Sequence, residues 1–222
     1  MCVVTDISGK STLNIANNIS QVNDVKSRGT LRERILRVLL VEPDGSLTKY
    51  AIAKKAESSF PWAHEFLRKL EKLSLINGTK VTNYPALIEY WLKVKTKTEK
   101  KEYMHKDPLS LLKKAKLHYA LTTYQAENLV QRYLFPSRID FYIERKDAKE
   151  WHKLLTAEGL VGKGNVRLLI ADDHVFYGSF KRQSLNVVCI PQLIVDLFEE
   201  GGVCVEAAEK LLQKVKQPVI ST

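Results

Sequence analysis

The sequence predicts an α+β protein with two domains, a helical N-terminal domain that contains a β-hairpin and a mixed α/β domain after it. Three observations lead to this prediction. Apolar residues recur at helical spacing from Thr30 onward, Asn77-Gly78 separates two short β-prone runs, and β-prone runs alternate with helical patterns after residue 108. The chain has 222 residues, of which 45% are hydrophobic and 27% charged, so it is long enough for one or two buried cores.

Three helices are expected at the start of the first domain. The apolar periodicity predicts the first over residues 30–41. A second is expected over 49–56, where Thr48 can act as its N-cap. The third should span residues 61–73, because its apolar residues form one stripe and Pro61 suits the first helical turn.

A hairpin and a fourth helix complete this domain. Asn-Gly at 77–78 is the strongest short-range hairpin signal. The order helix, helix, helix, hairpin over residues 26–94 is typical of a winged helix-turn-helix domain, whose third helix enters the major groove of DNA. The fourth helix, over 84–94, would pack on this domain or form a dimer contact.

Segments of different composition flank the two domains. Residues 1–25 are rich in Asn, Ser, Thr and Val and have no sustained apolar period, so a poorly ordered arm is expected there. Residues 95–107 are dominated by Lys, Thr and Glu, which predicts a basic linker. Residues 217–222 are expected to form a short tail.

The second domain, residues 108–216, is expected to be α+β with a small mixed sheet. No internal repeat of fixed period is visible in it. Helices are predicted over 123–134, 147–158, from Pro191 to the glycines at 201–202, and over 203–215, and strands over 138–144, 166–171, 175–180 and 185–190.

The basic charge of the chain lies in one segment. Residues 26–118 contain 21 Lys and Arg against 10 Asp and Glu, a local net charge of +11, whereas the whole chain carries +10. Lys and Arg gain free energy by releasing counterions from phosphate, so a basic domain joined to a neutral one is typical of nucleic-acid binders. Two alternatives stay open, a merely solvated basic face and a winged domain that binds protein.

The residues expected to contact DNA are those that such a fold places at the duplex. The third helix would donate to bases and phosphates, its start would bind phosphate, and the hairpin and second helix would add further contacts. They are Trp62, His64, Arg68, Lys69 and Lys72 on the third helix, Ser58 and Ser59 at its start, Asn77, Thr79 and Lys80 on the hairpin, and Lys49, Lys54 and Lys55 on the second helix.

Other kinds of chemistry find little support in the sequence. Cys2, Cys189 and Cys204 have no C-x-x-C spacing and the histidines are scattered, so no disulfide framework and no metal site are expected. No apolar run approaches the roughly 18 residues that a membrane span needs, and the first residues do not resemble a signal peptide. We therefore expect a cytoplasmic protein without a catalytic set, a metal, a cofactor or a membrane partner.

Several short motifs of the second domain match a pattern known from one protein family. They are Tyr119-Ala120-Leu121-Thr122 before a helix, Arg138-Ile139-Asp140-Phe141-Tyr142-Ile143, Asn165-Val166-Arg167-Leu168-Leu169, Pro191-Gln192, Asp196-Leu197, Gly201-Gly202, Glu206-Ala207-Ala208 and Leu211-Leu212. In these motifs residues 110–215 resemble the AbiEi-like C-terminal domain of the AbiE-type abortive-infection antitoxins, a family with a winged helix-turn-helix in front. The resemblance implies a transcriptional regulator that binds double-stranded DNA at its own promoter and counteracts a toxin with a nucleotidyltransferase fold. A homodimer would suit two DNA half-sites.

Residues 119–143 also resemble, more faintly, the start of a nucleotidyltransferase core, which would make the second domain a degenerate form of that fold. Such a core needs Gly-Ser before a helix and two carboxylates at alternate strand positions to hold metal ions. Here Thr122-Thr123 replaces Gly-Ser, and position 142, two after Asp140, is Tyr. We therefore predict an antitoxin-like autorepressor that is no enzyme. An adaptor that docks a toxin without DNA and a residual nucleotidyltransferase remain the alternatives.

Overall fold

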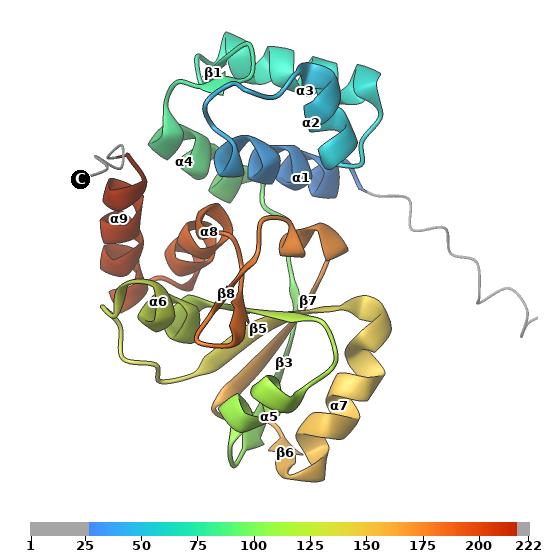
Figure 1. Ribbon diagram of the computed structural model, residues 1–222, viewed down its shortest axis with the longest axis vertical. Coiled ribbons are helices and arrows are strands. Elements are labelled where there is room, and N and C mark those ends of the chain that lie inside the picture. The colour runs from blue at the N-terminus through green and yellow to red at the C-terminus, as the bar shows by residue number, and fades with distance from the viewer. Residues whose placement is uncertain (1–26, 217–222) are drawn as a thin grey trace, which may run out of the picture.

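The helices of residues 28–94 and a short hairpin form one end of the molecule, the helical end, and a β-sheet with further helices forms the other, the sheet end, in the computed structural model, which describes residues 27–216 (Figure 1). The chain is of mixed α and β class with a mixed sheet, as the sequence predicts. The expected arm over 1–25 and the tail over 217–222 lie outside the described residues. None of the helices in the described part of the chain combines the length and the apolar character that a membrane span requires.

The helical end follows the predicted order of elements. Side-chain oxygens of Ser27, Thr48 and Asn83 accept hydrogen bonds from backbone N–H groups in the first turns of three helices, which fixes where these helices begin. The elements are α1 (Arg28–Val41), α2 (Lys49–Lys55), α3 (Phe60–Lys72), the strands β1 (Ile76–Asn77) and β2 (Lys80–Val81), and α4 (Tyr84–Val94).

The hairpin differs from the prediction in its turn. Asn77 pairs with Lys80 across the two strands, so Gly78 and Thr79 form the turn, one position later than the Asn-Gly pattern suggests. Gly78 has a φ of 64°, which a glycine adopts without strain at the first turn position. Its N–H donates to Oε1 of Glu71 at 3.0 Å, and this contact from α3 helps to set the register.

Seven strands form one mixed sheet in the order β6-β3-β7-β5-β4-β9-β8. β5 runs parallel to β7 and β4 parallel to β9, and the other neighbours are antiparallel. The central strands β4, β5 and β7 are largely buried. The strands are β3 (Glu99–His105), β4 (Tyr119–Thr122), β5 (Ile139–Glu144), β6 (Gly159–Val161), β7 (Val166–Ala171), β8 (Phe180–Arg182) and β9 (Leu185–Val187).

Helices cover this sheet and connect it to the helical end. α6 packs on β4, β5 and α8, while α7 packs on β3 and β6. α1 and α4 both contact α8, and one apolar core continues from the helical end into the sheet. The helices are α5 (Pro108–Lys114), α6 (Thr123–Gln131), α7 (Ala148–Ala157), α8 (Ile190–Glu200) and α9 (Val203–Lys216), with short 3-10 turns at Arg145–Asp147 and Asp173–Phe176.

The prediction of a basic linker over 95–107 is wrong. Residues 99–105 form β3, which pairs with β7 on one side and with β6 on the other. The strand is hard to recognise in the sequence because most of it is exposed, and Tyr103 and His105 are its only buried residues. Two backbone hydrogen-bond ladders and these two side chains outweigh the low β-propensity of Lys and Glu.

Two of the predicted strands are also displaced. The strand predicted over 175–180 is replaced by a 3-10 turn at 173–176, because the carboxylate of Asp172 accepts a hydrogen bond from the backbone N–H of His174. Strand pairing begins only at Phe180. The strand predicted over 185–190 ends at Val187, since α8 begins at Ile190 with a proline in its first turn.

A buried polar contact joins the helical end to the sheet end. Arg37 of α1 donates to Oε1 of Gln192 at 2.6 and 3.1 Å and to Nδ1 of His174 at 3.0 Å. Because arginine only donates, Nδ1 accepts, and Nε2 carries the proton that it donates to the carbonyl of Lys55 at 3.0 Å. Burial and the charge of Arg37 lower the pKa of His174 from 6.5 to about 4. His174 is therefore neutral in the folded protein at neutral pH.

Acidification from pH 7 to pH 5 is expected to destabilise the fold by about 2 kcal/mol through His174. Its pKa is lower in the folded than in the unfolded state, so between pH 6.5 and about 4 the unfolded chain binds the additional proton. Stability present above pH 6.5 is lost as the pH falls through this window. Urea denaturation at several pH values measures the slope. His174→Gln does not titrate and should lack this part of the slope, and an unchanged slope in the variant would contradict the assignment.

Candidate functional site

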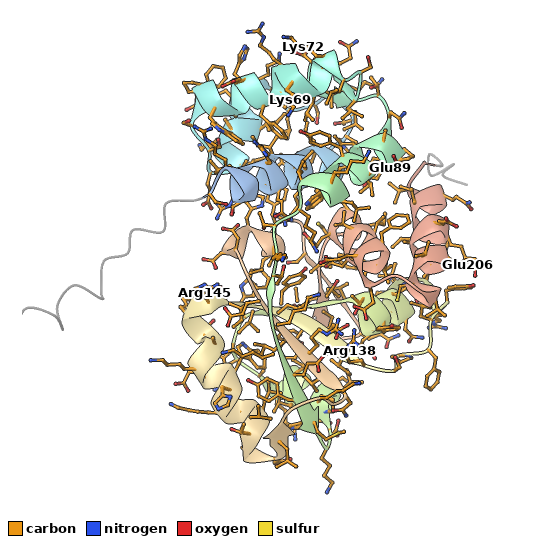
Figure 2. The ribbon with its side chains drawn as sticks, turned by 180° about the vertical axis from the view of Figure 1, so that it is seen from behind. Lys69, Lys72, Glu89, Arg138, Arg145 and Glu206 are labelled. Atoms are coloured by element: carbon orange, nitrogen blue, oxygen red, sulfur yellow. The ribbon has the colours of Figure 1, made fainter. Side chains whose placement is uncertain are left out.

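α3 lies at the end of the molecule opposite the sheet. Its apolar stripe of Ala63, Phe66, Leu67 and Leu70 is buried, so the opposite, outward face is turned away from the core. Figure 2 places Lys69 and Lys72 at this end. The structure thus leaves the outward face of α3 open to a large partner.

Four cations of α2 and α3 are exposed and unpaired. Lys54, Arg68, Lys69 and Lys72 form no ion pair with any residue in the range 27–216. Asn77 and Lys80 on the hairpin are also exposed. Cations without a carboxylate partner are free to contact phosphates and base edges. The predicted contacts on α3 and the hairpin therefore lie together at one end of the molecule.

Two of the predicted lysines have partners within the protein. Nζ of Lys49 lies 3.4 Å from both carboxylate oxygens of Glu71, the residue that also holds the hairpin turn. Nζ of Lys55 contacts Glu42 at 2.7 Å and the hydroxyl of Tyr177 at 3.2 Å. Lys49 thus ties α2 to α3, and Lys55 faces the sheet end, so both are less available to DNA than the cations of α3.

Of three other predicted contacts, the side chains of Ser58 and Thr79 bond to backbone carbonyls, whereas that of Ser59 makes no capping bond. Ser59 is the N-cap of α3, but its side chain makes no capping bond. Ser58 Oγ donates to the carbonyl of Ser59 at 3.2 Å. Thr79 Oγ1 donates to the carbonyl of Gly45, also at 3.2 Å, and thereby attaches the hairpin turn to the loop before α2.

Trp62 and His64 are only partly exposed. Trp62 stacks on Phe66, with 5.6 Å between ring centroids, so most of its surface serves packing. The ring of His64 lies 5.7 Å from that of Phe60. Nδ1 of His64 is buried and finds no hydrogen-bond partner in the described part of the chain.

An exposed aromatic pair lies beside these cations and is not among the predicted contacts. Tyr50 of α2 is 67% exposed and Phe60 of α3 is 43% exposed, with 6.2 Å between their rings. Nearly all residues that the sequence predicts as DNA contacts are polar, so the pair is not among them. One sequence signal points to this pair: Phe60 stands at the start of α3, before the apolar stripe that packs into the core.

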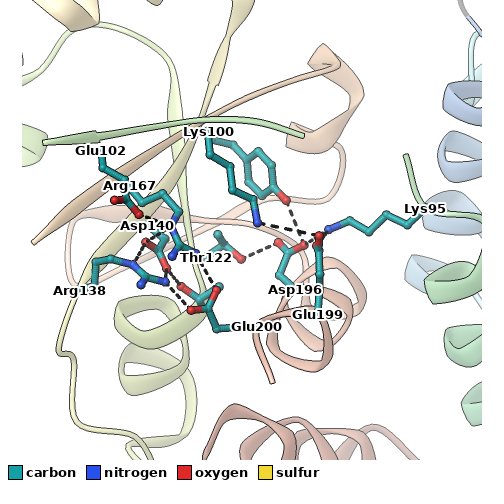
Figure 3. Close-up of polar contacts among 12 residues, drawn as sticks. Lys95, Lys100, Glu102, Thr122, Arg138, Asp140, Arg167, Asp196, Glu199 and Glu200 are labelled. Carbon is teal, nitrogen blue, oxygen red and sulfur yellow. Dashed lines mark hydrogen bonds and ion pairs between the residues drawn. The ribbon is translucent and has the colours of Figure 1, made fainter. Parts of the chain in front are cut away.

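The sheet end contains a buried ionic cluster around Asp140, shown in Figure 3. Asp140 accepts hydrogen bonds from Arg138 at 2.6 and 2.9 Å and from the hydroxyl of Thr123. Glu200 of α8 bridges Arg138 and Arg167, each at 2.7 Å. The Asp140 side chain has no exposed surface. A metal ion would therefore have to displace these bonds to reach Asp140, and no group of three or more metal-ligating residues occurs in the described part of the chain.

A second buried carboxylate, Asp196, lies next to this cluster (Figure 3). It accepts from Thr122 at 2.7 Å, Gln192 at 2.8 Å, Tyr142 at 3.0 Å and Lys95 at 3.0 Å. Burial lowers the pKa of Lys95, but Asp196 and Glu199 outweigh it and raise that pKa well above its ordinary value. Lys95 stays charged, and it holds the chain between α4 and β3 against α8.

A cavity of about 530 Å³ lies between α1, residues 95–98 and the ends of β5 and β7. Arg34, one of the two buried arginines that line it, contacts Asp172 at 2.5 and 2.7 Å and Glu57 at 2.6 Å. Because these carboxylates already neutralise its guanidinium, Arg34 itself does not select an anionic ligand.

Comparison of the chain with protein families, curated proteins and solved structures gives no match. Its function is therefore inferred from its own residues and contacts.

Proposed function

We propose that this protein is a sequence-specific regulator that binds double-stranded DNA, with its helical end acting as a winged helix-turn-helix. One observation carries the proposal: the outward face of α3 presents Arg68, Lys69 and Lys72, which are exposed and have no ion-pair partner among residues 27–216. A helix with such a face suits the major groove, and Lys80 on the hairpin would contact phosphate beside it. Two copies would suit a symmetric operator.

The resemblance of the second domain to AbiE-type antitoxins gives this regulator a more specific role. We propose that it represses its own promoter and binds a toxin with a nucleotidyltransferase fold. Catalysis is not part of the proposal, because both carboxylate oxygens of Asp140 already accept hydrogen bonds from protein side chains.

Binding of the full chain to the duplex upstream of its own gene, against a scrambled duplex, tests the proposal. The series should cover about 50 to 200 mM salt, where binding through several phosphates weakens steeply. Selective binding that falls with salt is the expected result. No binding to either duplex at the lowest salt would overturn it.

Arg68→Ala is expected to weaken binding to the preferred duplex by about 5- to 150-fold, the loss of one guanine contact worth roughly 1–3 kcal/mol. The loss should be smaller on scrambled duplex, where no base is read. Fluorescence anisotropy with both duplexes measures it. An equal loss on both would make Arg68 a phosphate contact.

Lys80→Ala is expected to weaken binding to all duplexes alike and to reduce the salt slope by about 1, because Lys80 would neutralise one phosphate. The same salt titrations provide the measurement. An unchanged slope would count against a phosphate contact by the hairpin.

Docking of a partner protein at the same end is a second candidate, favoured by three exposed apolar residues. Tyr50, Phe60 and Leu73 are 67%, 43% and 50% exposed. The packing of α2 and α3 therefore leaves much of their apolar surface uncovered, as at protein-binding sites. A chain that binds toxin but no duplex at any salt concentration would select this candidate.

A further inference from the structure

We propose that Glu65 determines part of the DNA specificity by accepting a hydrogen bond from the N4 amino group of a cytosine. The inference deepens the proposed function and rests on it. Glu65 is exposed on α3, one helical turn before Arg68 and Lys69. It places a negative charge among cations, where it would repel the phosphates of DNA unless its carboxylate makes a contact of its own.

Glu65 occupies the middle of the outward face of α3. At about 100° per residue, it points roughly opposite to the apolar stripe and within about 60° of Arg68 and Lys72. Residues three apart on a helix have their Cβ atoms about 5–6 Å apart. Glu65 and Arg68 would therefore approach the same or neighbouring base pairs when α3 lies in the major groove.

Glu65 has no structural contact that explains its carboxylate. The chain has seven acidic residues between positions 27 and 94, and within the described residues Glu65 and Glu89 are the two without a hydrogen-bond or ion-pair partner. The others are engaged: Glu33 with Trp91 and Thr96, Glu42 with Lys55, Asp44 with Ser46, Glu57 with Arg34, and Glu71 with Lys49 and Gly78.

The chemistry of the base edges selects cytosine as the partner of this carboxylate. An ionised carboxylate only accepts hydrogen bonds. In the major groove guanine presents two acceptors, thymine an acceptor and a methyl group, and adenine a donor beside the acceptor N7, whereas cytosine presents its N4 donor. Arg68, which only donates, suits guanine. Glu65 and Arg68 together therefore predict G·C base pairs in the preferred site.

The test begins with selection of preferred duplexes from a random-sequence pool by the full chain. Affinities are then measured for every single-base-pair substitution of the selected site. The wild type should prefer cytosine at one position by about 5- to 150-fold. Glu65→Gln should lose this preference and shift it toward adenine, because glutamine both donates to N7 and accepts from N6.

Glu89→Gln is the matched control, since it removes the same charge from another exposed, unpaired glutamate. Glu89 lies on α4, the helix that packs on α1 and α8 (Figure 2). This variant should leave the preference at every position unchanged. If both variants change binding in the same way, net charge is the cause and the inference is overturned.

Two further outcomes separate the inference from the function on which it rests. If Glu65→Gln strengthens binding to all duplexes by one factor and alters no base preference, Glu65 only repels phosphate, and the inference fails while the proposed function stands. If the wild type selects no duplex even at low salt, the proposed function fails and the inference falls with it.

Discussion

Asp140→Ala is expected to lower the free energy of unfolding by about 3–5 kcal/mol, the usual loss when one partner of a buried ion pair is removed. Asp140 is fully buried and accepts two hydrogen bonds from Arg138. Without it, Arg138 and Arg167 keep only Glu200 as a close common partner. Both guanidinium side chains are less than one-fifth exposed, so water replaces the lost carboxylate poorly.

Urea denaturation of the full chain, followed by circular dichroism, measures this loss. Asp140→Asn keeps the volume and one acceptor oxygen, and its loss should lie between those of the wild type and the alanine variant. Glu150→Ala is the control at an exposed pair with Lys153, where little change is expected. A loss in Asp140→Ala no larger than in Glu150→Ala would show that the buried cluster does not hold the sheet end together.

The same cluster bears on the chemistry of the sheet end. Residues two apart on a strand point to the same face, so Asp140 and Tyr142 of β5 are neighbours, and Arg138, just before the strand, bonds to Asp140. A site for two metal ions would need a carboxylate at both positions. Here Asp140 is paired with the guanidinium of Arg138, and position 142 is a tyrosine that donates to Asp196 at 3.0 Å. These contacts give Asp140 and Tyr142 a stabilising role in the sheet end.

The helical end could be predicted because its signals are local. Its apolar stripes repeat within each helix, and the cap at Thr48 lies next to the turn that it fixes. The unpaired cations of α3 follow from the same stripe, since a residue off the apolar face is exposed. The same signals do not show that Lys49 and Lys55 form ion pairs within the protein. Their partners, Glu71 and Glu42, come from other elements of the fold.

The errors arise where distant contacts decide the structure. β3 carries lysines that indicate a solvated segment, yet its pairing with β7 joins residues more than sixty positions apart. Arg34 is a charged residue of α1, yet its side chain is buried against Asp172, 138 positions away. No local periodicity reveals such pairs, because a buried cation and a solvated one look the same in the sequence.

Lys95→Met tests one of these distant pairs, and it is expected to destabilise the protein by about 3 kcal/mol. Methionine keeps the packing of the stem, but it leaves Asp196 buried without its cation. The ammonium of Lys95 lies 3.0 Å from Asp196, 101 positions later, and both side chains are less than one-tenth exposed. Lys97→Met, at an exposed neighbour, should change little in the same urea titration.

A double-mutant cycle with Asp196→Asn separates the pair from the packing around it. Lys95 and Asp196 interact directly, so the double variant should lose about 1–3 kcal/mol less than the sum of the two single variants. Additive losses would mean that Lys95 stabilises the fold only through its apolar stem. A clear coupling would instead show that this ion pair, beside the backbone pairing of β3, holds the segment after α4 on α8.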